Sequence, residues 1–259
     1  MTPADEPSTG SPDAAGREAA PPTQSAAPAT LLLAALRDEI WPCVKAMSLA
    51  PTELAGRFVS PDGAITARYV GIGAERALAA LNEEHQRGPL RLVVHLGFAG
   101  GLDPQLKPGE IIEPRWVTDE SGACLAVRPG DERPADAPPR ATLLTLSQLA
   151  DSPQTKRTLF EARGTGAVDM ESVHSVRWAT AQGVPIRLLR SISDTANTAL
   201  PAAAATWVRP DGTADVGRAV AYLARHPLIA GTLMKLNSAS KAGARAMAQR
   251  VAQWLTDEA

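Results

Sequence analysis

From Thr30 onward, short apolar runs alternate with longer segments whose apolar residues recur at helical spacing. Strands are expected at Leu31–Leu36, Ala64–Val70, Leu90–Leu96, Ile111–Val117, Ala123–Val127, Ala141–Leu146, Ala167–Asp169 and Ile186–Ile192. Helices are expected at Ala74–Gln86, from Ser152-Pro153, at Glu171–Gln182 and over most of the chain after Ile192. This alternation predicts an α/β fold, a three-layer α/β/α domain with a mixed central sheet.

Three segments qualify this prediction. Arg37-Asp38-Glu39 is a charged loop or a helix start, Gly97–Gly101 is expected to end its strand in a turn, and Arg128–Arg140 is a Pro- and Asp-rich excursion. We expect the domain to cover residues 30–259, with about 200–259 forming a helical C-terminal extension.

Residues 1–29 have a different amino-acid composition from the rest of the chain. Met1–Ala29 consists mostly of Ala, Pro, Ser, Thr and acidic residues, with no large apolar side chain after Met1. Such a segment cannot bury enough surface to offset its chain entropy. It also lacks the charged start and apolar middle of a secretory signal, so a disordered tail is predicted.

Composition narrows the class of function. The 259 residues carry a formal net charge of −2, which argues against a nucleic-acid partner. The longest apolar run, Leu31–Leu36, is far shorter than the roughly 20 residues of a membrane span, so we expect a cytoplasmic protein.

No cofactor or metal is expected. Gly71-Ile72-Gly73 resembles half a dinucleotide fingerprint, but position 76 is Arg and not the third glycine. Metal-ligand spacing is missing among the cysteines and histidines, which are Cys43, Cys124, His85, His95, His174 and His226.

Candidate chemistry follows the predicted strands, because ligands bind outside the carboxyl ends of the strands in such sheets. The segments are Asp38-Glu39, Gly97–Gly101, Met170-Glu171 and Ser193-Asp194. We expect three carboxylates and one small-residue loop to converge on one rim. Each also has a structural explanation: Glu39 and Glu171 as acids at helix starts, the glycines as a turn and Asp194 as an Asx-turn residue.

The order of these motifs resembles the purine nucleoside phosphorylase and nucleosidase superfamily, especially the methylthioadenosine/S-adenosylhomocysteine nucleosidases. The resembling segments are Gly71–Gly73, Leu96–Leu102, Lys107–Ile112, Ala167–Ser172 and Arg190–Asp194. The resemblance implies that the protein cleaves the N-glycosidic bond of a purine nucleoside.

The resemblance also implies roles for single residues. Asp194, beside Ser193, would protonate or hydrogen-bond N7 of the departing purine. Glu171 would accept hydrogen bonds from the ribose 2′- and 3′-hydroxyls and favour the cationic sugar, while Met170 would pack against the ribose. The backbone of Phe98, Ala99 and Gly100 would approach the base.

Hydrolysis is favoured over phosphorolysis. Glu39 matches the glutamate with which the nucleosidases activate water, and Asp38 and Glu39 would repel phosphate, although Arg37 could serve it. Phosphate-dependent cleavage and a non-catalytic nucleoside-binding protein are the alternatives. Three departures stand out: Phe98 has no hydroxyl, Asn197 replaces a second Asp, and Ser147–Ala150 offers only Leu149 where an aromatic segment would cover the base.

The C-terminal stretch resembles a narrower branch, the hopanoid-associated phosphorylase-like proteins of bacteria, which remove adenine from an adenosyl-hopane. That likeness rests on Leu200-Pro201, Val208–Gly212 and the segments up to Trp254. Apolar residues from Val216 to Leu236 would form the core-facing side of an amphipathic pair of helices, or would accept a bulky apolar 5′ group. In the first case their basic flank would face water, and in the second it would lie against an anionic membrane. The family implies a homo-oligomer.

Overall fold

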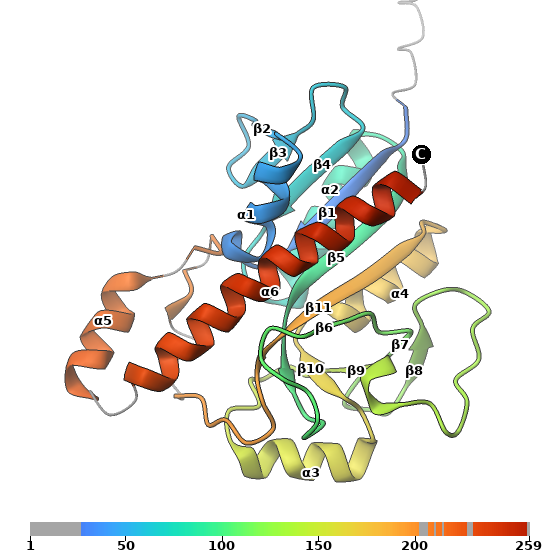
Figure 1. Cartoon of the computed structure of the whole chain (residues 1–259). Helices are drawn as coiled ribbons and strands as arrows, with labels where there is room; N and C mark the ends of the chain where they lie inside the picture. Colours follow the sequence, from blue (N-terminus) through green and yellow to red (C-terminus); the bar gives the residue numbers. More distant parts are fainter. Residues whose placement is uncertain (1–26, 202–206, 210, 214, 227–229, 258–259) are drawn as a thin grey trace, which may run out of the picture.

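The structure is a computed structural model, and it describes residues 27–201, 207–209, 211–213, 215–226 and 230–257 (Figure 1). Residues 1–26 of the expected tail lie outside the described residues. Ala29, the last residue assigned to that tail, is the first residue of a strand, so the folded part begins one residue earlier than expected. None of the described helices is long and apolar enough to cross a membrane.

The described chain forms one sheet flanked by helices. Its strands are β1 (Ala29–Ala34), β2 (Ala50–Pro51), β3 (Arg57–Val59), β4 (Ile65–Tyr69), β5 (Leu90–Gly101), β6 (Ile111–Ile112), β7 (Trp116–Thr118), β8 (Cys124–Ala126), β9 (Thr142–Thr145), β10 (Ala167–Asp169) and β11 (Ile186–Asp194). Its α-helices are α1 (Arg37–Ala46), α2 (Ala74–Arg87), α3 (Pro153–Arg163), α4 (Ser172–Gln182), α5 (Val216–Arg225) and α6 (Ala230–Asp257).

The sheet is mixed and organised around the long strand β5. The strand order is β2-β3-β4-β1-β5-β10-β9-β7-β8, and β11 pairs with β5 and β6. One edge of β5 holds β1 in parallel and then β10 in antiparallel orientation, while β11 runs parallel along the other edge. Strand β5 therefore contains one of the segments expected to carry chemistry, Gly97–Gly101. It also pairs with β11, which ends in Ser193 and Asp194, and with β10, which precedes Met170 and Glu171.

Helices cover both faces of this sheet, which makes three layers (Figure 1). On one face, α2 and α4 pack through buried residues such as Leu81 and Val176. On the other face, α1 and α6 pack through Ile40 and Met247. The three-layer α/β/α fold with a mixed sheet, expected from the sequence, is confirmed.

The C-terminal segment is helical as expected, and its last helix belongs to the outer layer. Among the described residues of α6, the buried hydrophobic ones are Ala244, Met247, Ala248, Val251 and Trp254. Gly243 permits the close approach of α6 to β11, because a Cβ at this position would lie 1.8 Å from Ser191 Oγ.

The amphipathic face expected further upstream is described only in part. Residues 228 and 229 lie outside the described residues, as do the side chains of Val216, Val220, Leu223 and Leu233. Met234 is 72% exposed and therefore does not face the core. Helix α5 lies apart from the sheet (Figure 1). The ring of its Tyr222 stacks on His226 and lies 5.2 Å from the ring of Trp207 at an interplanar angle of 59°.

Local capping signals were interpreted correctly. Ser152 caps α3, its side chain accepting a hydrogen bond from Thr155 N at 3.1 Å, with Pro153 at the first helical position. Gly183 ends α4 in the left-handed conformation at φ 66°. Glu171 is the N-cap residue of α4, so this helix begins one residue later than expected.

The largest differences from the predicted boundaries concern three strands, while β1 ends at Ala34 and not at Leu36. The strand expected to end at Leu96 continues to Gly101, because Gly97–Gly101 stay paired with β11 and β10. The single strand expected over Ile111–Val117 is split into β6 and β7, which pair with different strands, and Pro114 between them has no N–H to donate. Strand β11 continues through Ser193 and Asp194, which were expected to follow the strand.

Candidate active site

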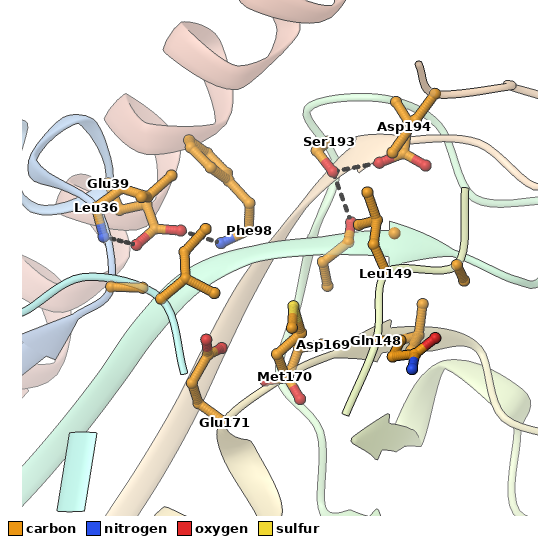
Figure 2. A pocket seen from close by; sticks show the side chains of 17 residues that line it. Leu36, Glu39, Phe98, Gln148, Leu149, Asp169, Met170, Glu171, Ser193 and Asp194 are labelled. Carbon is orange, nitrogen blue, oxygen red and sulfur yellow. Dashed lines mark hydrogen bonds between the residues drawn. The ribbon is translucent and has the colours of Figure 1, made fainter. Parts of the chain in front are cut away.

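One cavity collects the residues at the ends of β1, β5, β10 and β11 (Figure 2). Its volume is about 170 Å³. It is lined by Ala35, Leu36, Glu39, Ile72, Phe98, Ala99, Gly100, Gln148, Leu149, Ala150, Val168, Asp169, Met170, Glu171, Ser193, Asp194 and Leu200. All eight candidate residues of the sequence analysis are among them, whereas Asp38 is not and is exposed.

The convergence arises in two ways. Strands β1, β5 and β11 are parallel, so their carboxyl ends meet at one edge of the sheet. Strand β10 is antiparallel to β5, with Val168 opposite Gly100, and therefore its end points back along β5. Figure 2 shows Glu39 and Asp194 on opposite sides of the cavity, with Glu171 and Met170 along a third side.

Glu39 is buried in the first turn of α1. Its Oε2 accepts a hydrogen bond from Leu36 N at 2.7 Å, and its Oε1 accepts one from Phe98 N at 2.8 Å. Burial raises the pKa of Glu39 to about 7, against the lowering effect of these two bonds. A carboxyl with this pKa exchanges protons readily at neutral pH, which suits a general base.

Gly97 keeps β5 close to this carboxyl. A Cβ at position 97 would lie 3.3 Å from Glu39 Oε1 and 3.6 Å from Arg190 Nη1. That spacing is tighter than ordinary van der Waals contact with Glu39. The glycine interpreted as part of a turn is therefore an extended residue that leaves room for the carboxylate.

Glu171 lies at the N-cap of α4, where its Oε1 accepts a hydrogen bond from Gly73 N at 2.8 Å. Burial, followed by the negative charge of Asp169, raises the pKa of Glu171 to about 7. The Gly71–Gly73 segment thus holds the Glu171 carboxylate in place.

Asp169, which lines the cavity, forms a buried ion pair with Arg190. Arg190 Nε donates to Asp169 Oδ2 at 3.0 Å, and its Nη1 and Nη2 donate to His95 O at 2.7 Å and Ser172 Oγ at 2.6 Å. Thr145 Oγ1 donates to Asp169 Oδ1 at 2.8 Å. The polar atoms of both side chains are thus bound to other groups of the protein. We therefore interpret the pair as a structural one that holds the ends of β10 and β11 together.

Asp194 ends β11 and is 2% exposed. Its Oδ1 accepts a hydrogen bond from Ser193 Oγ, and its Oδ2 accepts one from Lys156 Nζ. Gly100 lets β5 run past this carboxyl, because a Cβ there would lie 3.5 Å from Asp194 Oδ2 and 3.3 Å from Val168 Cγ1.

The remaining walls are apolar or uncharged. Gln148, Leu149 and Ala150 line one side of the cavity, and Leu149 is 39% exposed. Phe98 lines the cavity and also packs against the core on the α1–α6 face.

Among the described residues that line the cavity, none is Lys or Arg. Arg37, the one residue that could have served phosphate, lies over the ring of Trp41 at 4.3 Å from its centroid. No group of three His, Cys, Asp or Glu residues in the described part of the chain could hold a metal ion.

Lys156 was not predicted from the sequence as a functional residue, and no role was predicted for Arg190 or Asp169. Lys156 is fully buried, although it occupies the first turns of a helix whose neighbouring residues are exposed. A lysine on an amphipathic helix usually faces water, and its partner lies 38 residues away, so no local pattern indicated it. For Arg190, the one feature of the sequence that pointed to a role was its position in the Arg190–Asp194 motif.

Several solved structures resemble this one. No protein-family model and no curated protein matches the chain. The Helicobacter pylori 5′-methylthioadenosine/S-adenosylhomocysteine nucleosidase matches with a TM-score of 0.64 and 18% identity, over 91% of this chain and 100% of that chain. Helicobacter pylori futalosine hydrolase matches with a TM-score of 0.62 and 18% identity, over 90% of this chain and 98% of that chain.

A third match is a nucleosidase of the first kind from Campylobacter jejuni, with a TM-score of 0.60 and 16% identity over 87% of this chain and 97% of that chain. Each of these matches covers nearly the whole of the solved chain, so the likeness extends over the complete architecture. The chain therefore has the fold of the 5′-methylthioadenosine/S-adenosylhomocysteine nucleosidases and futalosine hydrolase, the nucleoside phosphorylase/nucleosidase fold.

Proposed function

We propose that this protein is a hydrolase that cleaves the N-glycosidic bond of a purine nucleoside. The observation that carries the proposal is the placement of Glu39, Glu171 and Asp194 around one cavity at the strand ends. A binding protein has no need of a buried carboxyl with a pKa near 7 on one side of its ligand and a second carboxyl on the other.

The chemistry follows from these positions. The sugar becomes cationic as the C1′–N9 bond breaks, so carboxylates beside it stabilise the transition state. Glu39 takes a proton from the attacking water, and Glu171 accepts hydrogen bonds from the ribose hydroxyls. Asp194, on the opposite side of the cavity, meets N7 of the departing purine, and Met170 packs against the ribose.

Water is favoured over phosphate as the nucleophile. A phosphate site needs arginines or other donors, whereas the described cavity lining offers carboxylates and no Lys or Arg. Arg37 is directed toward Trp41, and Arg190 is held by Asp169, Ser172 and backbone carbonyls.

Adenine is the base that we propose, with a bulky apolar group on the 5′ carbon. A Helicobacter pylori nucleosidase of this fold was crystallised with 5′-methylthioadenosine in its active site. Leu36, Ile72 and Leu200 give this cavity apolar walls suited to such a group. An adenosyl-hopane is one nucleoside of this kind, and it remains a prediction, as do peripheral membrane contact, a homo-oligomer and a cytoplasmic location.

The test is base release from adenosine, 5′-methylthioadenosine and inosine, together with a long-alkyl 5′-substituted adenosine. We expect Asp194→Asn to lower base release by about 10² to 10⁴ while a thermal-shift assay still detects nucleoside binding. An Asp194→Asn variant within threefold of the wild type would remove Asp194 from the mechanism. Stabilisation by nucleosides without base release would favour a non-catalytic binding protein, and equal turnover of adenosine and its alkyl derivative would refute the apolar 5′ group.

A further inference from the structure

Lys156 is a fully buried cation that reaches the candidate active site from α3. Its Nζ donates hydrogen bonds to Asp194 Oδ2, to Thr195 O at 3.0 Å and to Thr198 O at 2.9 Å. An ammonium group has three N–H donors and no acceptor. Every donor of Lys156 is therefore used, and all three acceptors belong to the end of β11 and the turn that follows it.

The surroundings of Lys156 are built to hold it in place. Ser152 caps the helix one turn earlier, and the turn over Thr195–Thr198 is closed by a hydrogen bond from Thr198 N to Thr195 O at 3.0 Å. Burying an ammonium group is costly unless it is paired and hydrogen-bonded. In a protein that needed only packing at this position, an apolar side chain would serve as well.

The pair changes how Asp194 can act. Both of its carboxylate oxygens are already engaged, Oδ2 by Lys156 Nζ and Oδ1 by Ser193 Oγ, which also lies 3.2 Å from Ala99 O. As the partner of the Lys156 ammonium group in a buried ion pair, the Asp194 carboxylate has no proton of its own to give to a purine. The ammonium group of Lys156 is a proton donor in direct contact with it.

We propose that Lys156 is a positioning residue that supplies, through Asp194, the proton that the departing purine takes up at N7. This inference rests on the proposed function. As the C1′–N9 bond breaks, its electron pair moves into the purine, N7 takes a proton from Asp194, and Asp194 takes one from Lys156. Water adds to C1′ and loses a proton to Glu39. After the base leaves, Glu39 releases its proton to solvent, and Lys156 regains one through Asp194.

The experiment is a double-mutant cycle on adenine release, with kcat and KM measured separately. The variants are Lys156→Met, Asp194→Asn and the double variant, and the control is Arg157→Met, which removes a charge from an exposed position of the same helix. We expect each single variant to lose about 10² to 10⁴ in kcat with KM within threefold. We expect the double variant to be no slower than Asp194→Asn alone, because Lys156 acts only through Asp194.

A second substrate separates proton supply from structural support. A p-nitrophenyl riboside has a leaving group that needs no proton, so Lys156→Met should keep its wild-type rate on this substrate while losing adenine release. Equal losses on both substrates, a kcat within threefold of Arg157→Met, or a double variant that loses the product of both single losses would overturn the inference. If Lys156→Met does not fold, the double variant, which leaves no unpaired charge, is compared with Asp194→Asn. If the wild type and Arg157→Met release no base, the proposed function itself has failed.

Discussion

Lowering the pH should reduce activity in two coupled steps, because Glu39 and Glu171 both have a pKa raised to about 7. Glu39 must be ionised to take a proton from water, and Glu171 must be ionised to stabilise the cationic sugar. Protonation neutralises both carboxylates as the pH falls through 7. Activity is therefore expected to decrease toward acid pH.

The magnitude follows from the two ionisations. At pH 6, a group with a pKa of about 7 is about one tenth ionised, so a reaction that needs two such groups retains about one hundredth of its plateau rate. At pH 5, the same reasoning gives about 10⁻⁴. The slope of log kcat/KM against pH should thus approach two below pH 6, and kcat/KM reports the free enzyme.

The assay measures kcat/KM for base release between pH 5 and pH 8.5 in buffers of constant ionic strength, for the wild type and for Glu171→Gln. The variant keeps one of the two ionisations, so its slope should fall to about one. A flat wild-type profile down to pH 5 would refute the need for either carboxylate. An unchanged slope of two in the variant would assign the second ionisation to a different group.

Two further predictions concern stability and are measured by urea denaturation. Gly243→Ala should lower the free energy of unfolding by about 1–3 kcal/mol or more, because its Cβ would lie 1.8 Å from Ser191 Oγ. The control is Gly231→Ala on the same helix, which should not destabilise the protein because no atom lies within 4 Å of its Cβ. Equal effects of the two changes would contradict the tight contact between helix and sheet. Lys156→Met should lower the free energy of unfolding by about 3–5 kcal/mol, because it leaves Asp194 buried without its cation. Adding Asp194→Asn should recover most of that loss. A double variant less stable than Lys156→Met would argue against the ion pair.

Much of the architecture was visible in the sequence because strands and helices impose different periods on apolar residues. Caps at Ser152 and Gly183 act within a few residues, so their side chains and backbone indicate the helix ends directly. Helix α1 was left open as a loop or a helix start. Pro42 lies inside this helix, and because proline usually interrupts a helix, its presence argued against one in the sequence.

The misassigned residues depend on partners distant in sequence. Gly97–Gly101 were interpreted as a turn because glycine is common in turns, whereas pairing with β10 and β11 keeps them extended. The position of the carboxylates could be expected from the strand-end rule. Their environment could not be predicted, since burial raises the pKa of Glu39 and the contact between Lys156 and Asp194 joins α3 to β11.

The most direct test of the proposed hydrolysis is the product formed from adenosine in the absence and presence of inorganic phosphate. The purified protein is incubated with adenosine in phosphate-free buffer, and the base and sugar are separated by chromatography. We expect adenine and free ribose at a rate that phosphate does not change, because the described cavity lining holds carboxylates and no cation. Adenine release that requires phosphate and yields ribose 1-phosphate would contradict the assignment of Glu39 as the residue that activates water.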